Sequence, residues 1–158
     1  TRALEQWAHM KTQFAGRQVL LLSDARFTTK TFLSGLPSQV TLIGRIRKDA
    51  KLFFPPVEQP ARGRRRLFGD RAPTPEQIRQ DDQIPWQTIP IHAAGADHNC
   101  RVKVLDHILW PPASSNRTLR LIVIAPLAYR SRKGSRLLYR DPAYLICTDP
   151  TLPLQQTV

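Results

Sequence analysis

The sequence is short of cysteine, glycine and acidic residues, and it has no long apolar run. Its two cysteines, Cys100 and Cys147, form no disulfide-framework spacing, which fits a reducing, cytoplasmic location. Its seven glycines are too few for Gly-rich phosphate loops, and P-loop, dinucleotide and serine-hydrolase motifs are all absent. No apolar stretch approaches the ~20 residues that a membrane-spanning helix needs. The first residues also lack the apolar segment of a signal peptide.

The scarcity of acids leaves a strongly basic chain. Its 158 residues include 24 Lys and Arg but 12 Asp and Glu, so the net charge is +12. Such a chain favours a polyanionic partner. Binding to a membrane surface would need a basic amphipathic helix with bulky apolar residues on its other face, and the sequence contains none. Nucleic acid is therefore the expected partner, and no membrane partner is expected.

A single carboxylate, Asp24, follows the unbroken apolar run Val19–Leu22. The run predicts a β-strand covered on both faces, as in parallel or central positions of a sheet. A short helix should follow, capped by Thr28 or Thr29 and ended by Pro37. The apolar segment that begins at residue 40 predicts a second strand, so this part of the chain has the size of a βαβ unit.

Asp24 has two chemical interpretations. A carboxylate at the carboxyl end of a strand in an open α/β sheet lies where such folds bind ligands. Mg²⁺ prefers oxygen ligands of this kind, and two ions about 4 Å apart can activate water and stabilise the leaving oxygen of a phosphodiester. From the residue alone, a helix cap or an ion pair with Arg26 is the commoner role. No other acid is placed to pair with Asp24: Asp49 should be a surface charge, and Asp141 and Asp149 turn residues.

Basic residues cluster in three places, each a candidate for phosphate contacts. On the second predicted strand Arg45 and Arg47 alternate onto one face, followed by Lys48. Six of the 14 prolines lie between residues 55 and 85, and residues 61–71 hold five arginines, so this segment predicts a mobile basic loop. The third cluster, bracketed by two tyrosines that could stack on bases or pack in a core, comprises Arg130, Arg132, Lys133, Arg136 and Arg140.

The second half of the chain is predicted to be mostly β. Before it, Thr74 and Gln77 around Pro75 have the spacing of a capping box, which predicts a helix of about two turns. Apolar and basic residues then alternate over 100–104, as is typical of a strand. Further apolar segments at 117–127 and 142–149 predict more strands, joined by polar turns. Together these segments predict an antiparallel subdomain.

Three stretches carry a family resemblance: LLLSDARFTTKTFLSGLP, TLIGRIRKDAKLFFPP and RKGSRLLYRDPAYLICTD. They resemble bacterial insertion-sequence transposases of the DDE class, and the similarity extends over nearly the whole chain. The resemblance implies an α/β fold, a partial RNase H-like core with an inserted, mostly antiparallel β subdomain. It places residues 1–54 in the catalytic core, 55–141 in the basic loop and β-rich insertion, and 142–158 in a truncated return toward the core.

The resemblance also implies roles for individual residues. Asp24 would be the second of three acidic ligands for Mg²⁺ or Mn²⁺. The first is expected upstream of this chain and the third, a Glu, beyond Val158, so these residues alone should be inactive as a nuclease. The full-length enzyme would cleave transposon-end DNA and join its 3′-hydroxyl to target DNA. The expected DNA contacts are Arg45, Arg47, Lys48, Arg62, Arg64, Arg65 and Arg66.

The partners implied are transposon-end and target DNA, with a homodimer as an option for the full-length protein, in the cytoplasm and at the nucleoid when DNA is bound. Two other interpretations stay open. One is a non-catalytic DNA-binding remnant, and the other is a host nuclease with an RNase H-like core. An upstream strand-borne Asp and a downstream helical Glu would favour the enzyme over the remnant. Inverted repeats flanking the gene would argue against the host nuclease.

Overall fold

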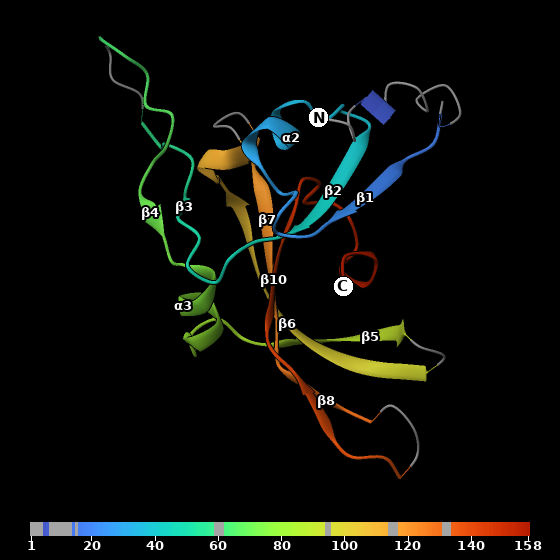
Figure 1. The fold of residues 1–158 in the computed structure, drawn as a ribbon. Coiled ribbons are helices and arrows are strands. Elements are labelled where there is room, and N and C mark those ends of the chain that lie inside the picture. Colours follow the sequence, from blue (N-terminus) through green and yellow to red (C-terminus); the bar gives the residue numbers. More distant parts are fainter. Residues whose placement is uncertain are drawn as a thin grey trace.

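The chain is a mixed α/β protein, rich in strands and with few, short helices (Figure 1). The computed structural model describes residues 5–6, 14, 16–58, 62–93, 96–113, 117–130 and 134–158. Residues 132 and 133 of the third basic cluster lie outside these ranges. Among the described residues, no helix is both long enough and apolar enough to cross a membrane.

Six strands form one mixed sheet in the order β1-β2-β10-β7-β6-β5. The strands are β1 (Val19–Ser23), β2 (Val40–Arg45), β5 (Gln87–Ala93), β6 (Ala96–Ile108), β7 (Leu119–Ile124) and β10 (Ala143–Cys147). β1 and β2 run parallel, whereas the other neighbours in this sheet are antiparallel. The predicted strands of the second half are thereby confirmed, and they continue the same sheet as β1 and β2.

Two short hairpins extend from this body in different directions (Figure 1). One pairs β3 (Leu52–Phe53) with β4 (Arg71–Ala72), and the chain between these strands, residues 54–70, is called the β3–β4 arm below. The other pairs β8 (Leu127–Tyr129) with β9 (Leu138–Arg140), and residues 127–140 are called the β8–β9 ribbon. The predicted basic loop is thus anchored at its base by a pair of strands.

The helices begin where the sequence predicts. α2 (Lys30–Ser34) has Thr29 as its N-cap, and the Thr29 hydroxyl accepts a hydrogen bond from the Phe32 N–H. α3 (Pro75–Gln80) has the complete capping box of Thr74 and Gln77. β1, α2 and β2 therefore form the predicted βαβ unit. Two short 3₁₀ helices complete the fold, η1 (Pro111–Ala113) and η2 (Leu154–Gln156).

Apolar side chains pack on both faces of the sheet. One cluster includes buried residues of α2, α3 and η1, and the other includes residues near the carboxyl end of the chain. Leu42 and Ile46 belong to the first cluster and Ile43 to the second. This confirms the predicted alternation along the second strand, since successive side chains of a strand point to opposite faces.

The first strand differs from its prediction. β1 is the edge strand of the described sheet and pairs with β2 alone. Its side chains alternate between half-buried and exposed, with Leu20 42% and Leu22 75% exposed. The expectation of a strand covered on both faces is therefore wrong for the described chain. An unbroken apolar run does not distinguish a central strand from an edge strand with one open face.

Candidate functional site

Asp24 directly follows β1, at the carboxyl end of the parallel β1–β2 pair. Its main-chain carbonyl accepts hydrogen bonds from the N–H groups of Phe27 (2.9 Å) and Thr28 (3.1 Å). Its side-chain Oδ1 accepts one from the N–H of Ala25 at 2.7 Å. Because α2 is capped by Thr29, Asp24 is not the helix cap that was one of its two interpretations. Within the described ranges its carboxylate forms no ion pair with Arg26.

The turn that holds Asp24 is packed against β2 by three small residues. The buried hydroxyl of Thr28 donates to the Asp24 carbonyl at 3.0 Å and lies 2.8 Å from Ser23 Oγ. Ser23 is opposite Gly44 in the β1–β2 pairing, and a Cβ on Gly44 would lie 2.8 Å from Thr28 Oγ1. Glycine at 44 therefore allows this close approach. A glycine inside a predicted strand is the sequence signal for such a close approach. For Thr28 the sequence indicated only a possible helix cap.

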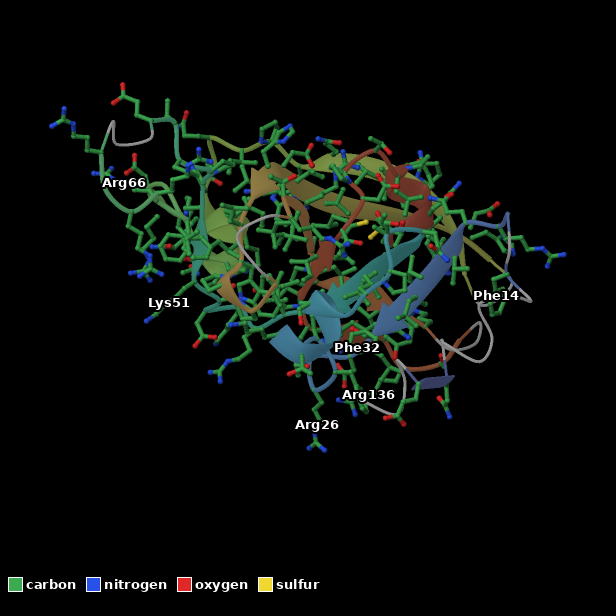
Figure 2. All side chains as sticks on the ribbon, turned by 90° about the horizontal axis from the view of Figure 1, so that it is seen from above. Phe14, Arg26, Phe32, Lys51, Arg66 and Arg136 are labelled. Atoms are coloured by element: carbon green, nitrogen blue, oxygen red, sulfur yellow. The ribbon has the colours of Figure 1, made fainter. Side chains whose placement is uncertain are left out.

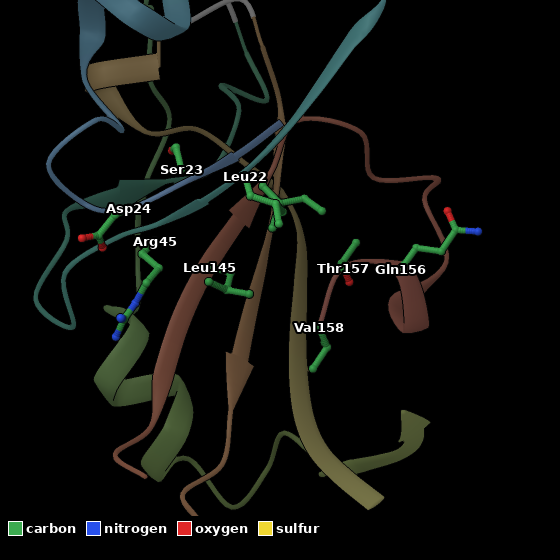
Figure 3. A pocket seen from close by; sticks show the side chains of 9 residues that line it. Leu22, Ser23, Asp24, Arg45, Leu145, Gln156, Thr157 and Val158 are labelled. Carbon is green, nitrogen blue, oxygen red and sulfur yellow. The ribbon is translucent and has the colours of Figure 1, made fainter. Parts of the chain in front are cut away.

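An open pocket of about 530 Å³ lies beside this turn (Figure 3). Asp24 and Arg45 lie next to each other at one end of it, and Leu22 and Leu145 form an apolar middle. The opposite wall is built from Gln156, Thr157 and Val158 of the η2 turn. A carboxylate and a guanidinium thus share one end of a partly apolar hollow at the edge of the sheet.

The exposed carboxylate of Asp24 fits the role of one oxygen ligand for a hard divalent cation, because one of its oxygens is held only by a main-chain N–H. In the described ranges, no three His, Cys, Asp or Glu side chains come together as a metal-binding group. These residues therefore supply a single ligand and do not by themselves form a complete two-metal centre.

The first of the three basic clusters, predicted on the second strand, lies close to Asp24. Arg45 ends β2 and is exposed, and Arg47 and Lys48 follow it in an exposed turn. Arg47 forms a two-pronged pair with Asp49, with Nε–Oδ1 at 2.9 Å and Nη2–Oδ2 at 3.1 Å. The Arg47 hydrogen bond lowers the pKa of the Asp49 carboxyl. Asp49 is thus the predicted surface charge. Exposed pairs of this kind are weak and readily exchanged for another anion.

The arginines of the β3–β4 arm are elsewhere. They are all exposed, and the arm is continued beyond its strands by hydrogen bonds between Phe54 and both Gly69 and Asp70. Figure 2 shows Arg66 at one end of the molecule, well separated from Arg26 in the turn that follows Asp24. The DNA contacts predicted in the arm are therefore not part of the pocket. These residues are Arg62, Arg64, Arg65 and Arg66.

Other charged groups form a partly buried network on the sheet face that α3 covers. Lys103 is 0% exposed, and its Nζ donates to the main-chain oxygens of Arg79 (3.1 Å) and Asp81 (2.6 Å). It also lies 4.7 Å from the centroid of the Trp86 ring. Lys103 therefore caps the carboxyl end of α3. Nothing in the alternating sequence of this strand distinguished it from its exposed neighbour Arg101.

A carboxylate completes this network. Glu76 accepts hydrogen bonds from Arg79, from the Tyr144 hydroxyl and from Gln80. The bond from Arg79, followed by that from Tyr144, lowers the pKa of Glu76 to about 2. Burial, with the Glu76 bond second, raises the pKa of Tyr144 to about 12. These groups hold α3 against β10, so we assign them to the fold and not to a site.

Comparison of the chain with protein-family models, curated proteins and solved structures found no match. The features of the chain that bear on function are therefore the pocket at the end of β1 and the exposed cations. Both cysteines are buried free thiols. Burial raises the pKa of each, which makes them poor nucleophiles.

Proposed function

We propose that this chain is the central part of a DDE transposase. In this proposal β1, α2 and β2 belong to an RNase H-like catalytic core, the strands within residues 55–141 belong to its insertion, and β10 belongs to the return toward the core. The observation that supports it best is the placement of Asp24. An exposed carboxylate at the carboxyl end of a parallel strand pair, beside an open pocket, lies where α/β sheets bind ligands.

Asp24 would be one of three acidic ligands of Mg²⁺ or Mn²⁺, with the other two supplied by the full-length enzyme outside these residues. The chemistry supplied by such an ion would be polarisation of the scissile phosphodiester and a lower pKa of the attacking water. The chain's own contribution is positional. Thr28 and Gly44 fix the turn, so the carboxylate is presented at the rim of the pocket and not folded back into a helix cap.

The exposed cations would bind the phosphates of DNA. Arg45 shares the pocket end with Asp24, which supports a contact between its guanidinium and the DNA strand that would be cut. Arg47 and Lys48 extend the positive charge along the same edge. The arginines of the β3–β4 arm are not among the residues that line the pocket and would bind DNA outside the cleavage site. Phosphate contacts position the DNA without reading its sequence.

The first test replaces the carboxylate with its amide. Asp24→Asn in the full-length protein should reduce cleavage of transposon-end DNA to background while DNA binding is retained, because an amide removes the ligand charge and keeps the shape. When Mn²⁺ is titrated into the present chain, the amide NMR signals of Ser23 to Thr28 should broaden before the others. Asp24→Asn should remove that broadening.

Asp82→Asn is the matched control, since Asp82 is also an exposed carboxylate in a turn. It should leave both cleavage and Mn²⁺ broadening unchanged. Retained cleavage in Asp24→Asn would overturn the ligand assignment. A full-length wild-type protein that binds DNA and never cuts it would instead favour the non-catalytic remnant.

A further inference from the structure

The β8–β9 ribbon continues the central ladder of the sheet beyond the body of the protein. Ile124 of β7 lies opposite Ala143 of β10, and three residues further out on each strand Leu127 lies opposite Arg140. The two ladders therefore share one register. They are separated where Pro126 and Pro142 occur, because proline has no N–H to donate to a ladder. Beyond that break the ribbon projects from the sheet (Figure 1).

The ribbon has little packing to account for its form. All three residues of β9 are exposed, and Tyr139 is 75% exposed. An isolated two-stranded hairpin is marginally stable in water. Two contacts within the ribbon support it: the Arg140 guanidinium lies 5.0 Å from the centroid of the Tyr129 ring, and Arg130 bonds to the Ser135 carbonyl. A projecting ribbon with so little burial is not explained by a role in the core.

The charge of the ribbon has one sign. Residues 127–140 contain five basic residues and no Asp or Glu. The three that the structure describes, Arg130, Arg136 and Arg140, are all exposed. Arg130 bonds to the carbonyl of Ser135 across the turn. Within the described part of the chain none of the three is paired with a carboxylate. The ribbon is therefore complementary to a polyanion.

A two-stranded β-ribbon fits the major groove of duplex DNA, which is about 12 Å wide, and several DNA-binding proteins insert ribbons of this kind. An anionic membrane is the less suitable partner. Its binding requires bulky apolar side chains to enter the bilayer. In the described part of the ribbon Leu137 and Leu138 are only 36% and 38% exposed, and the more exposed Tyr139, at 75%, can also stack on bases.

We propose that the β8–β9 ribbon is a second DNA-contacting element, which binds backbone phosphates of the duplex through Arg130, Arg136 and Arg140. The inference rests on the proposed function for its partner, DNA. It adds a contact surface separate from both the pocket and the β3–β4 arm. In Figure 2 Arg136 and Arg66 lie in widely separated parts of the molecule, so the two basic elements would grip different stretches of DNA.

The test measures duplex-DNA binding by fluorescence anisotropy over a series of salt concentrations. The ribbon variant is Arg130→Gln, Arg136→Gln and Arg140→Gln together. Each lost phosphate contact should reduce the log–log salt slope by about 0.9, so the slope should fall by up to about 2.7. A matched variant changes three exposed cations outside both basic elements: Arg17→Gln, Lys30→Gln and Arg101→Gln. Its slope should stay at the wild-type value.

A third variant replaces the three ribbon arginines with lysine. It retains the charge and should keep a near wild-type slope, which separates loss of phosphate contacts from damage to the fold. A ribbon variant whose slope equals that of the matched variant would overturn this inference alone. Failure of the wild-type chain to bind duplex DNA would overturn the proposed function as well. Ribbon-dependent binding to phosphatidylserine vesicles, with an unchanged DNA slope, would assign the ribbon to membranes.

Discussion

Charged residues at the centre of the sheet and at its rim are held in opposite ways. Lys103 is fully buried and donates to two main-chain carbonyls of α3. Arg45, at the end of β2, is exposed beside a pocket. Glu76 is bonded by three side chains, whereas the carboxylate of Asp24 accepts one main-chain hydrogen bond. Both positive and negative side chains therefore occur in two settings: in one the protein satisfies their hydrogen bonds, and in the other they are left open to solvent.

This difference separates structural charges from charges that are available to a ligand. A buried charge must have its hydrogen bonds satisfied within the protein, because an unpaired one costs several kcal/mol. An exposed charge is satisfied by water and can exchange that water for a phosphate or a cation at little cost. We therefore expect substitutions in the central network to alter stability, and substitutions at the rim to alter binding.

The largest effect on stability is expected at Lys103. Lys103→Ala should lower the free energy of unfolding by about 3 kcal/mol, because the carbonyls of Arg79 and Asp81 lose their buried donor. Urea denaturation measures this directly. Arg101→Ala is the control, since its guanidinium lies 5.1 Å from the centroid of the same Trp86 ring but is exposed, and it should cost about 0.5–1 kcal/mol. Equal losses in the two variants would refute the assignment of Lys103 as the cap of α3.

A smaller, pH-dependent effect is expected at Glu76. The folded protein has this pKa at about 2, below the ordinary value of 4.5, so the folded state favours the ionised form. The resulting stabilisation is complete above about pH 4.5 and is lost as the pH falls toward 2. With its partial exposure discounted, Glu76→Gln should cost about 1–2 kcal/mol at pH 7.

The measurement for Glu76 is urea denaturation between pH 7 and 2. The wild-type and Glu76→Gln curves should converge as the pH falls toward 2. Tyr144→Phe keeps the Arg79 bond and removes only the hydroxyl bond to Glu76, so it should retain most of the acid dependence. Parallel wild-type and Glu76→Gln curves over the whole range would show that this carboxylate does not contribute to acid stability.

The smallest effect on stability is expected for the rim pair of Arg47 and Asp49. Arg47→Ala should leave the free energy of unfolding nearly unchanged, because both side chains are exposed, at 80% and 60%. The same urea experiment measures it. A loss as large as that of Glu76→Gln would place Arg47 among the structural charges and remove the contrast between rim and centre.

Local features of the fold were predictable from the sequence because their causes are local. The capping box needs only Thr74 and Gln77, three positions apart. The alternation along the second predicted strand likewise follows from adjacent residues, since Leu42 and Ile43 pack on opposite faces of the sheet. For the candidate site, the sequence indicated Asp24 at the end of its strand.

The remaining features depend on contacts between distant parts of the chain. Burial of Lys103 is set by α3, which lies more than 20 residues earlier. The exposed face of β1 depends on which strands pair beside it, and an apolar run contains no information about its neighbours. The η2 turn forms one wall of the pocket only because the carboxyl end of the chain folds back beside the sheet. The proposed transposase activity stays a prediction.

The pairing of β2 with β10 has a consequence for how the chain is made. Leu145 lies opposite Arg45, so about a hundred residues must be synthesised after β2 before that side of the strand finds its neighbour. At the usual 5–20 residues per second, the delay is about 5–20 s. During this interval the emerging polypeptide includes the arginines of the β3–β4 arm, whose mutual repulsion keeps nascent chains apart. The charge that suits this protein to bind an anion would thus also protect it from aggregation on the ribosome.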